Sequence, residues 1–189
     1  MRDGRSAASF DATGPGVPGR THRLVLLRHA KAEPAGGVDD VLRPLALNGR
    51  RQAGRVGAAL AHSALVPELV LCSSALRTRQ TWELLAANLG DVAPEVVVTD
   101  TLYAAGVKDV VDLVHGADSR VRTLLVIGHE PTMAATAAHL ASPGSDSGAL
   151  AQVRVGVPTA TYSVLESLTP WSEWVDGVAD LTYVGRPAS

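Results

Sequence analysis

The chain has 189 residues, 46% of them hydrophobic, and its 17 Lys and Arg against 19 Asp and Glu leave a net charge of −2. This size and composition predict one folded domain with its own core, and the small net charge excludes the electrostatic signature of a protein that binds nucleic acid or an anionic membrane. No apolar run approaches the roughly 20 residues that span a bilayer, and the single cysteine, Cys72, excludes an internal disulfide framework. Because the N-terminus also lacks the apolar core of a secretory signal, we expect a cytoplasmic protein.

The beginning of the chain differs in composition from the rest. Residues 1–21 are rich in Gly, Ala, Ser and Pro and show no hydrophobic period. They are therefore predicted to form a flexible N-terminal extension. Residues 22–189 are predicted to form the folded domain.

Short apolar runs alternate with amphipathic stretches from residue 22 to residue 140. The runs at Leu24–Leu27, Leu69–Cys72 and Leu124–Ile127 are typical of strands buried on both faces, and the amphipathic stretches are typical of helices. A strand followed each time by a helix predicts an α/β fold, a three-layer α/β/α sandwich with a mainly parallel central sheet and an antiparallel edge. The expected strands are Leu24–Leu27, Leu69–Cys72, Val96–Val98 and Leu124–Ile127, and the expected helices are 46–62, 75–89, 106–115 and 131–140.

The antiparallel edge is expected from the last part of the chain. Gln152–Val157 and Thr159–Leu165 alternate in polarity and are predicted to form an antiparallel strand pair. Leu181–Val184 is predicted to add further edge structure. Upstream, Ser73-Ser74 is predicted to cap the helix that carries Arg77.

Polar side chains follow three of the expected strands at the point where each strand ends. Arg28-His29 ends the first strand, Arg77 lies shortly after the second, and His129 follows the fourth. Because the carboxyl ends of parallel strands share one edge of a sheet, we expect these side chains to converge. Guanidinium forks match phosphate oxygens, a neutral His is a nucleophile toward phosphorus, and a second His can donate to developing negative charge. The pattern predicts phosphoryl transfer without a metal or other cofactor.

Two other chemistries fit these residues less well. His29 and His129 have no His-x3-His pattern or carboxylate cluster beside them, and two nearby arginines repel a cation, so we expect no metal site. A cysteine phosphatase needs a Cys-x5-Arg loop around the phosphate, whereas the sixth residue after Cys72 is Thr78. Cys72 is therefore predicted to be a buried strand residue.

The loop at Ala32–Pro44 follows the first strand directly. It is irregular and long, and it carries Arg43 and an acidic pair at positions 39–40. Loops of this length in compact domains are often functional, so this loop is predicted to select the substrate, either by docking a protein or by admitting a small molecule. Structural roles are predicted for other polar and aromatic side chains. Arg50, Arg51 and Arg55 are expected on a solvated helix face, and Trp171 and Trp174 in core or edge packing. Surfaces or helix ends are expected for His22, His62, His115 and His139.

Three stretches of the chain resemble one family. They are Leu24–Ala30, which reads Arg-His-Ala where the family has Arg-His-Gly, Ser73–Thr81 with its arginine, and Ile127–Pro131 with its histidine. Their content and order are similar to the motifs of the histidine phosphatase superfamily, which implies a phosphoglycerate-mutase-like fold. Within that superfamily, the runs Arg28–Ala32 and Arg43–Leu45 are most similar to the SixA-type phosphohistidine phosphatases.

This resemblance implies a function and a role for each candidate residue. It implies a phosphatase in which His29 is the nucleophile, becomes phosphohistidine during turnover, and acts on phosphohistidine in proteins. Two alternatives stay open, namely a phosphatase for small-molecule phosphate esters and a phosphate-binding module without catalysis. The expected partner is a phosphorylated protein or a small phosphorylated metabolite, rather than nucleic acid or a membrane. The residues implied to hold the phosphoryl group are Arg28, Arg77 and His129, with Lys31 and Arg43 as further substrate contacts.

The proton donor of many relatives is missing from its usual place. Relatives that act on phosphate esters often carry a Glu after the third strand, where this chain reads Asp100-Thr-Leu-Tyr103, with Tyr103 near the matching position. A tyrosine, with a pKa of about 10, is a poor acid for ester cleavage, whereas an imidazole leaves readily once it is protonated. The departure favours a phosphoramidate substrate, with Asp100 or Asp109 as the alternative acid.

Overall fold

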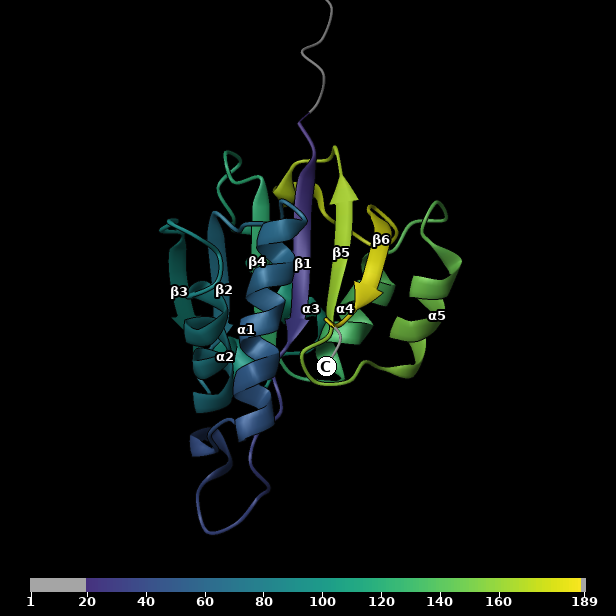
Figure 1. The fold of residues 1–189 in the computed structure, drawn as a ribbon. Coiled ribbons are helices and arrows are strands. Elements are labelled where there is room, and N and C mark those ends of the chain that lie inside the picture. Colours follow the sequence, from purple (N-terminus) through teal and green to yellow (C-terminus); the bar gives the residue numbers. More distant parts are fainter. Residues whose placement is uncertain (1–19, 188–189) are drawn as a thin grey trace, which may run out of the picture.

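A mixed β-sheet forms the middle layer of the molecule, whose computed structural model describes residues 20–187 (Figure 1). Its strands are β1 (His22–Arg28), β2 (Leu69–Ser73), β3 (Glu95–Thr99), β4 (Thr123–Gly128), β5 (Tyr162–Ser167) and β6 (Asp180–Gly185). In the order β3-β2-β4-β1-β5-β6, the first four strands run parallel, β5 is antiparallel to β1, and β6 is antiparallel to β5. The predicted mainly parallel sheet with an antiparallel edge is confirmed.

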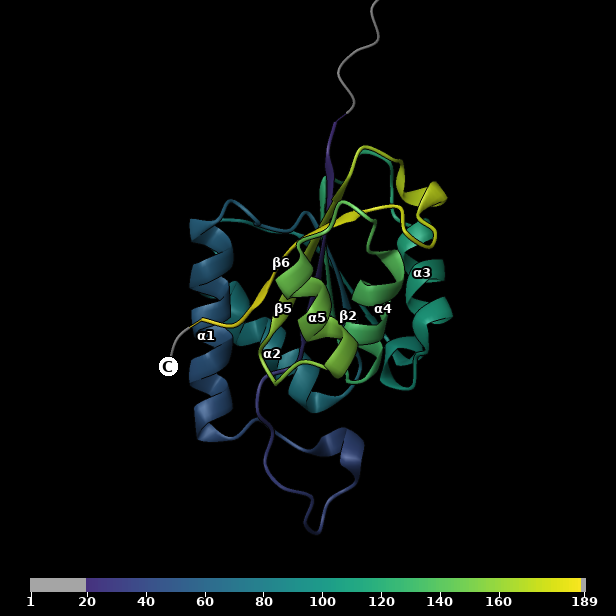
Figure 2. The same ribbon diagram turned by 90° about the vertical axis from the view of Figure 1, so that its right-hand side faces the viewer.

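Helices cover both faces of this sheet. In residues 20–187 they are α1 (Leu47–His62), α2 (Leu76–Ala86), α3 (Val107–His115), α4 (Thr132–Leu140) and α5 (Ser147–Val155), with short 3-10 helices at Asp40–Leu42, Asp100–Tyr103 and Trp171–Glu173. Figure 2, in which the sheet is seen edge-on, shows α1 and α2 on one side and α3, α4 and α5 on the other. The fold is the predicted three-layer α/β/α sandwich.

The strand β1 supplies side chains to both hydrophobic layers. Val25 and Leu27 pack into the cluster under α1 and α2, whereas Leu24 and Leu26 pack into the cluster under α3, α4 and α5. All four side chains are at most 1% exposed. A central strand buried on both faces needs an unbroken apolar run, which is why the sequence shows no polar alternation before Arg28.

Gly49 lets the first turn of α1 lie against the segment that follows β1. A Cβ atom at Gly49 would lie 1.9 Å from the carbonyl oxygen of Lys31, and the Ala46 N–H donates to that same oxygen at 2.9 Å. Any side chain at this position would push the helix and the strand end apart. The absence of a Cβ therefore helps to fix the backbone directly after His29.

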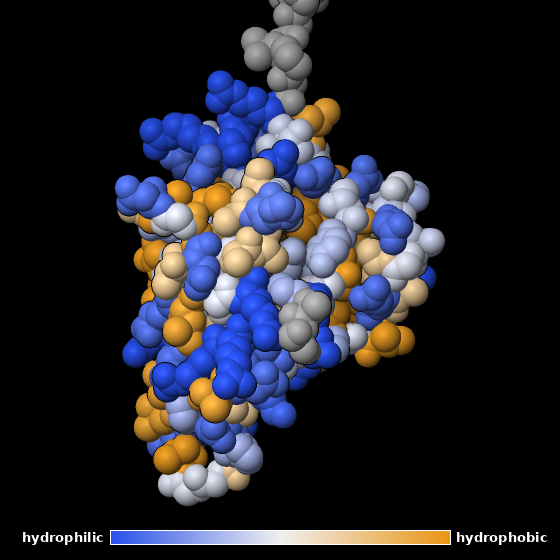
Figure 3. Space-filling model, in the orientation of Figure 1, coloured by the Kyte–Doolittle hydropathy of each residue, from blue (hydrophilic) through white to orange (hydrophobic). Residues whose placement is uncertain are grey.

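The outer face of α1 is hydrophilic. Arg50, Arg51 and Arg55 are all exposed, while Ala53 and Val56 face the core. Figure 3, drawn with α1 toward the viewer, shows hydrophilic side chains gathered over this helix, with apolar ones scattered around them. The predicted solvated face of this helix is confirmed.

The predicted strand at Gln152–Val157 is wrong, because these residues end the helix α5. Asp146 caps that helix by accepting the Ala149 N–H at 2.7 Å, and the buried positions Ala149 and Val153 are one helical turn apart. The alternation Val153-Arg-Val imitates a strand, but Val155 is 87% exposed. The helix ends at Gly156, whose φ of 94° suits glycine, and β5 pairs instead with β1 and β6.

The predicted cap of α2 is also wrong. The N-cap is Ala75, and no side chain caps the helix. Ser73 is instead the last residue of β2, where it is completely buried. The helix is shorter than predicted, since it ends at Ala86, and Leu89 follows it as a buried turn residue.

The side chain of His22 is buried, which contradicts the surface position predicted for it. His22 is 5% exposed, its ring lies 4.9 Å from the Trp171 ring, and burial lowers its pKa. The predicted first strand began at Leu24, whereas His22 is already the first residue of β1. Trp171 and Trp174 are core residues as predicted, at 1% and 0% exposure, and the helix-end positions are confirmed for His62, His115 and His139.

The predicted N-terminal extension, residues 1–21, lies outside the described residues except for Arg20 and Thr21. Within the described range, the longest helices are too short or too polar to cross a bilayer.

Candidate functional site

The ends of β1, β2 and β4 place four polar side chains together at one edge of the sheet. Arg28 is the last residue of β1 and His29 follows it, Arg77 lies in the first turn of α2, and His129 follows β4. The ring centroids of His29 and His129 are 5.2 Å apart. We call these four residues, all of them predicted from the sequence, the strand-end site.

His29 presents a neutral imidazole. Its Nδ1 lies 2.7 Å from the carbonyl oxygen of Ala30, and because a carbonyl only accepts, Nδ1 carries the proton and Nε2 keeps its lone pair. Burial, together with the positive charges of Arg77 and Arg28, lowers the pKa of His29 to about 4. The Ala30 N–H donates to Thr81 Oγ1 at 3.1 Å, which fixes this turn to α2.

His129 is oriented by Arg77 and Ser73. Arg77 Nη2 lies 3.3 Å from His129 Nδ1, and because a guanidinium only donates, this Nδ1 carries no proton. The proton is therefore on Nε2, which donates to Ser73 Oγ at 2.8 Å. Burial, with the charges of His29 and Arg77 next, lowers the pKa of His129 to about 3. Both imidazoles are neutral at pH 7.

Arg28 is held by the segment between α5 and β5. Its Nη1 donates to the carbonyl oxygen of Val157 at 2.6 Å, and the Val157 N–H donates in turn to Glu130 Oε1 at 2.7 Å. Glu130 follows His129 directly, and its other oxygen accepts the Ala134 N–H of α4 at 3.4 Å. The chain of contacts from Glu130 through Val157 therefore positions Arg28 beside His29.

Both arginines of the strand-end site carry an unused buried donor. The Nε atoms of Arg28 and Arg77 are buried and have no hydrogen-bond partner within residues 20–187. Leaving a buried donor unpaired costs about 1–3 kcal/mol, so both guanidinium groups keep the capacity to donate to a further acceptor. A phosphoryl group, with three oxygens and a guanidinium-matching geometry, fits this arrangement.

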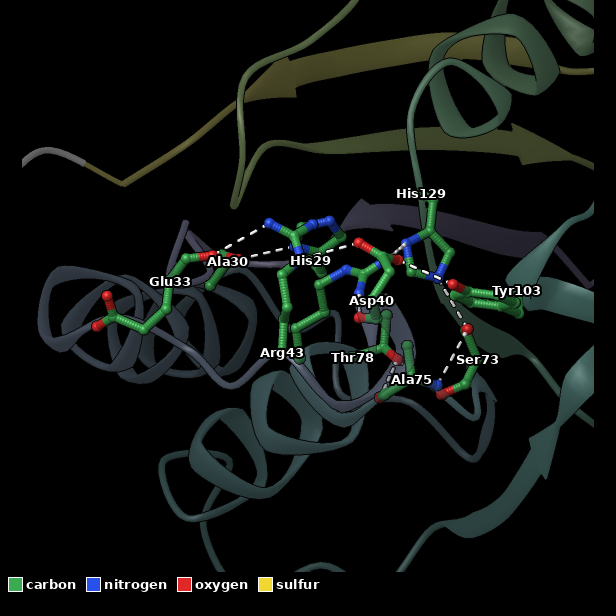
Figure 4. A network of polar contacts seen from close by, with 11 residues as sticks. His29, Ala30, Glu33, Asp40, Arg43, Ser73, Ala75, Thr78, Tyr103 and His129 are labelled. Atoms are coloured by element: carbon green, nitrogen blue, oxygen red, sulfur yellow. Dashed lines mark hydrogen bonds and ion pairs between the residues drawn. The ribbon is translucent and has the colours of Figure 1, made fainter. Parts of the chain in front are cut away.

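Asp40, from the 3-10 helix in the Ala32–Pro44 loop, lies over this site. Its carboxylate accepts from Arg43 Nε at 2.8 Å, from Arg77 Nη2 at 3.0 Å and from the Tyr103 hydroxyl at 2.8 Å. Figure 4 shows Asp40 between Arg43 on one side and Tyr103 and His129 on the other. The Tyr103 hydrogen bond first, then Arg77 and Arg43, lowers the pKa of Asp40, and the same bond raises the pKa of Tyr103.

Two of the predicted acids and substrate contacts, Tyr103 and Arg43, lie close to the strand-end site. Tyr103 lies beside His129, with ring centroids 5.7 Å apart, and Arg43 joins the Asp40 network. Asp109 Oδ2 accepts the Gly106 N–H at 2.8 Å at the start of α3, so it caps a helix. Lys31 is exposed, and within the described residues its recorded polar contacts come from its backbone.

Sequence reasoning missed three residues that support the site. Ser73 holds His129, Thr81 holds the turn after His29, and Asp40 holds Arg77. Thr81 follows Arg77 by one helical turn, and its hydroxyl donates to the Arg77 carbonyl at 2.6 Å, so that spacing was a usable signal. Asp40 precedes Arg43 by three residues, a spacing that lets the two side chains pair.

Residues 20–187 contain neither a metal-binding cluster nor an accessible cysteine. Among residues 20–187, His, Cys, Asp and Glu side chains form no group of three that could hold a metal ion. Cys72 is 0% exposed, and burial raises the pKa of its thiol to about 12. A thiol that stays protonated is no nucleophile, so the prediction of a buried strand residue is confirmed.

Known proteins match this chain in sequence. The family model described as histidine phosphatase superfamily (branch 1) matches residues 24–104. An uncharacterized protein of Mycobacterium tuberculosis is 37% identical over 156 residues, which are 82% of this chain and 96% of that protein.

Solved structures match it in fold. A protein of Nakamurella multipartitia, provisionally named phosphohistidine phosphatase SixA, is 32% identical with a TM-score of 0.80, and the match covers 92% of this chain and 100% of that one. A protein of Agrobacterium tumefaciens with the same provisional name is 28% identical with a TM-score of 0.71, over 88% of this chain and 98% of that one. Sequence and fold thus agree with the resemblance stated from the motifs, and the chain belongs to the histidine phosphatase superfamily as a phosphatase of the SixA type.

Proposed function

We propose that this phosphatase hydrolyses the P–N bond of phosphohistidine in proteins, with His29 as its nucleophile. The observation that carries the proposal is the neutral, buried imidazole of His29, whose proton is held on Nδ1 by Ala30. It shares the strand-end site with Arg28 and Arg77, whose positive charges act on it and whose Nε–H groups have no partner within residues 20–187. The proposal assigns these arginines and His129 to hold the phosphoryl group, with Arg43 and Lys31 nearer the rest of the substrate.

In the first step, the Nε2 lone pair of His29 attacks phosphorus. The P–N bond of the substrate breaks, and its electron pair goes to the departing ring nitrogen. If the substrate imidazole carries a proton on its other nitrogen beforehand, it leaves as a neutral ring and needs no proton from the enzyme. Arg28 and Arg77 supply positive charge to the equatorial oxygens throughout.

In the second step, water attacks the phosphorus atom of the phosphorylated His29. The new P–O bond forms as the P–N bond to Nε2 breaks, and its electron pair returns to Nε2 as the lone pair. Both protons of the water leave on the dihydrogen phosphate product. His29 ends in the tautomer in which it began, because the Ala30 carbonyl keeps the proton on Nδ1.

The groups near the mouth of the site favour a P–N substrate over an ester. Asp40 stays ionised because its neighbours lower its pKa, and the pKa of Tyr103 is raised. Asp109 is used to cap α3. An alkoxide leaving group needs a proton from a placed acid, whereas a protonated phosphohistidine carries its own.

The test is a pair of peptides of one sequence, phosphorylated on histidine or on serine. Phosphate release is measured for both in buffer with EDTA, because the arginines are expected to supply the charge that a metal would otherwise provide. We expect release from the phosphohistidine peptide and little from the phosphoserine peptide. Activity that disappears after prolonged chelation and returns with one added metal would contradict the assignment of charge to Arg28 and Arg77, and turnover of small phosphorylated metabolites alone would contradict the protein substrate.

Replacing Arg77 with lysine is expected to lower kcat/KM at least about tenfold. Lysine keeps the positive charge but loses the planar fork, and a charge-assisted contact contributes about 1.5–3 kcal/mol. Arg51→Lys on the outer face of α1 is the matched control, because Arg51 is exposed there. Steady-state kinetics on the phosphohistidine peptide measures both variants, and an Arg77→Lys enzyme as active as wild type would place this guanidinium outside the transition state.

A further inference from the structure

We infer that Asp40 determines specificity by accepting a hydrogen bond from the distal ring N–H of the substrate's protonated imidazole. A carboxylate in that position favours phosphoramidates with a cationic leaving group over phosphate esters. The inference rests on the proposed function and adds to it a residue that reads the leaving group rather than the phosphoryl group.

The position of Asp40 follows from burial at the strand-end site. His29 is 8% exposed, whereas the Asp40 side chain is 51% exposed. In-line displacement places the leaving group on the side of phosphorus opposite the nucleophile, which here is the open side. Asp40 reaches that side while it is tied to the site, since Arg77 Nη2 contacts both Asp40 Oδ2 and His129 Nδ1.

The contacts of Asp40 leave the Nε donors of both arginines unused. Its backbone and side-chain oxygens use Nη1 and Nη2 of Arg77, whereas the Nε of Arg77 and the Nε of Arg28 have no partner within residues 20–187. Asp40 therefore does not compete with a phosphoryl group for these two Nε–H donors. The carboxylate and the phosphoryl group use different donors of the same guanidinium.

The carboxylate also keeps one acceptor site of its own. Oδ2 accepts from Arg77 and Tyr103, whereas Oδ1 accepts from Arg43. Each carboxylate oxygen accepts two hydrogen bonds, so Oδ1 has capacity for one more donor. An ionised carboxylate accepts hydrogen bonds and cannot donate them. It can therefore bind the N–H of an imidazolium, but it offers neither a proton nor a hydrogen bond to a departing alkoxide oxygen.

The charged and titratable side chains that contact Asp40 come from three parts of the chain. Arg43 faces it from the end of its own loop, Arg77 from α2 and Tyr103 from the 3-10 helix after β3, with His129 behind Arg77. The two guanidinium groups and the phenol hydroxyl keep Asp40 ionised across the neutral range. Its negative charge in turn favours the protonated form of a bound phosphohistidine ring.

The test compares wild type with Asp40→Asn on two substrates, the phosphohistidine peptide and p-nitrophenyl phosphate. The leaving group of the second needs no proton and has no N–H. We expect Asp40→Asn to lower kcat/KM for the phosphohistidine peptide about tenfold or more beyond its effect on the aryl ester, as for a lost hydrogen bond to a charged group, because weaker support of Arg77 lowers both values alike. Asp39→Asn is the matched control, since it removes the same charge from the neighbouring residue, whose side chain makes no capping hydrogen bond.

A pH profile separates this role from simple support of Arg77. The alkaline limb of kcat for the phosphohistidine peptide reports loss of the imidazole proton in the bound state. In Asp40→Asn this limb is expected to move to lower pH, by about one unit for a tenfold effect, and Asp40→Glu is expected to restore it. With p-nitrophenyl phosphate the limb should not move, which also controls for any change in Tyr103.

Three results would contradict the inference. Equal losses on both substrates, with no movement of the alkaline limb, would show that Asp40 only positions Arg77 and would overturn the inference. Unchanged kinetics on both substrates would overturn it as well. A wild-type enzyme that cleaves p-nitrophenyl phosphate but not the phosphohistidine peptide would overturn the proposed function first, and this role of Asp40 with it.

Discussion

A His29→Ala enzyme is expected to fold normally and to release phosphate at least about 10³-fold more slowly than wild type. His29 is the one group at the strand-end site with an available nitrogen lone pair on the phosphoryl side, because the proton sits on Nδ1. Without it, no phosphorylated enzyme can form, and direct attack by water must proceed without an acid or base of suitable pKa. The side chain contacts the backbone of its own neighbour, so its loss leaves the sheet intact.

The measurement has two parts. Phosphate release from the phosphohistidine peptide gives the rate, and a melting temperature close to that of wild type shows that the variant is folded. In addition, wild type quenched during turnover should carry an acid-labile, base-stable phosphoryl label on the peptide that contains His29, and the variant should carry none. His62→Ala is the control, since it removes an imidazole from the exposed end of α1.

A label on another residue, or turnover kept by His29→Ala, would remove His29 from the role of nucleophile. If His29→Ala loses its fold as well as its activity, the test uses a His29→Asn variant, which keeps a polar side chain of similar size. In that variant we expect the same kinetic loss in a folded protein, because an amide nitrogen has no lone pair available for phosphorus.

The second large effect concerns the leaving group. Placing an acid at the mouth through Tyr103→Glu is expected to raise kcat/KM for an alkyl phosphate by a factor of about 10² or more, since general acid catalysis contributes typically 10²–10⁴-fold. The same change should do little for phosphohistidine, which carries its own proton. The Tyr103 hydroxyl lies 2.8 Å from Asp40 Oδ2, so a glutamate there would meet a second carboxylate, and this raises its pKa toward that of a useful acid.

The control for this variant is Tyr103→Gln, which has the shape of glutamate without its proton. Specificity constants are measured for the alkyl phosphate and the phosphohistidine peptide with all three enzymes. A gain on the alkyl ester for Glu but not for Gln identifies the proton as the cause. If wild type prefers the ester, and Tyr103→Glu leaves the ratio unchanged, the proton donor lies elsewhere and the argument from the missing acid is wrong.

The parallel part of the sheet was predictable because its signals are local. Each central strand is an apolar run buried on both faces, and Arg28 and His129 mark the ends of β1 and β4. The parallel direction of these strands and the edge that gathers the polar side chains therefore follow from the sequence, whereas the order β3-β2-β4-β1 does not. The helix α5 was not predictable in the same way. Val153-Arg-Val alternates like a strand, and the Asp146 cap and the helical spacing of Ala149 and Val153 outweigh that alternation only in the folded chain.

The supporting residues of the site escaped prediction for a different reason. Asp40 lies in a segment without a period, and its contacts with Arg77 and Tyr103 join parts of the chain that are far apart in sequence. Ser73 was read as a helix cap because Ser before a helix usually is one. Its hydroxyl is used instead for His129, a partner that comes from another strand.

The strand order has a consequence for how the chain is made. β1 leaves the ribosome first, yet its two neighbours in the sheet, β4 and β5, are among the last strands to be synthesised. Arg23 pairs with Thr123, and His22 pairs with Ser167. Until those partners are synthesised, the apolar strand β1 stays unpaired on both edges in the nascent chain. Strand pairing between such distant parts of a chain forms slowly. The strand that presents His29 therefore gains its two neighbours only late in synthesis.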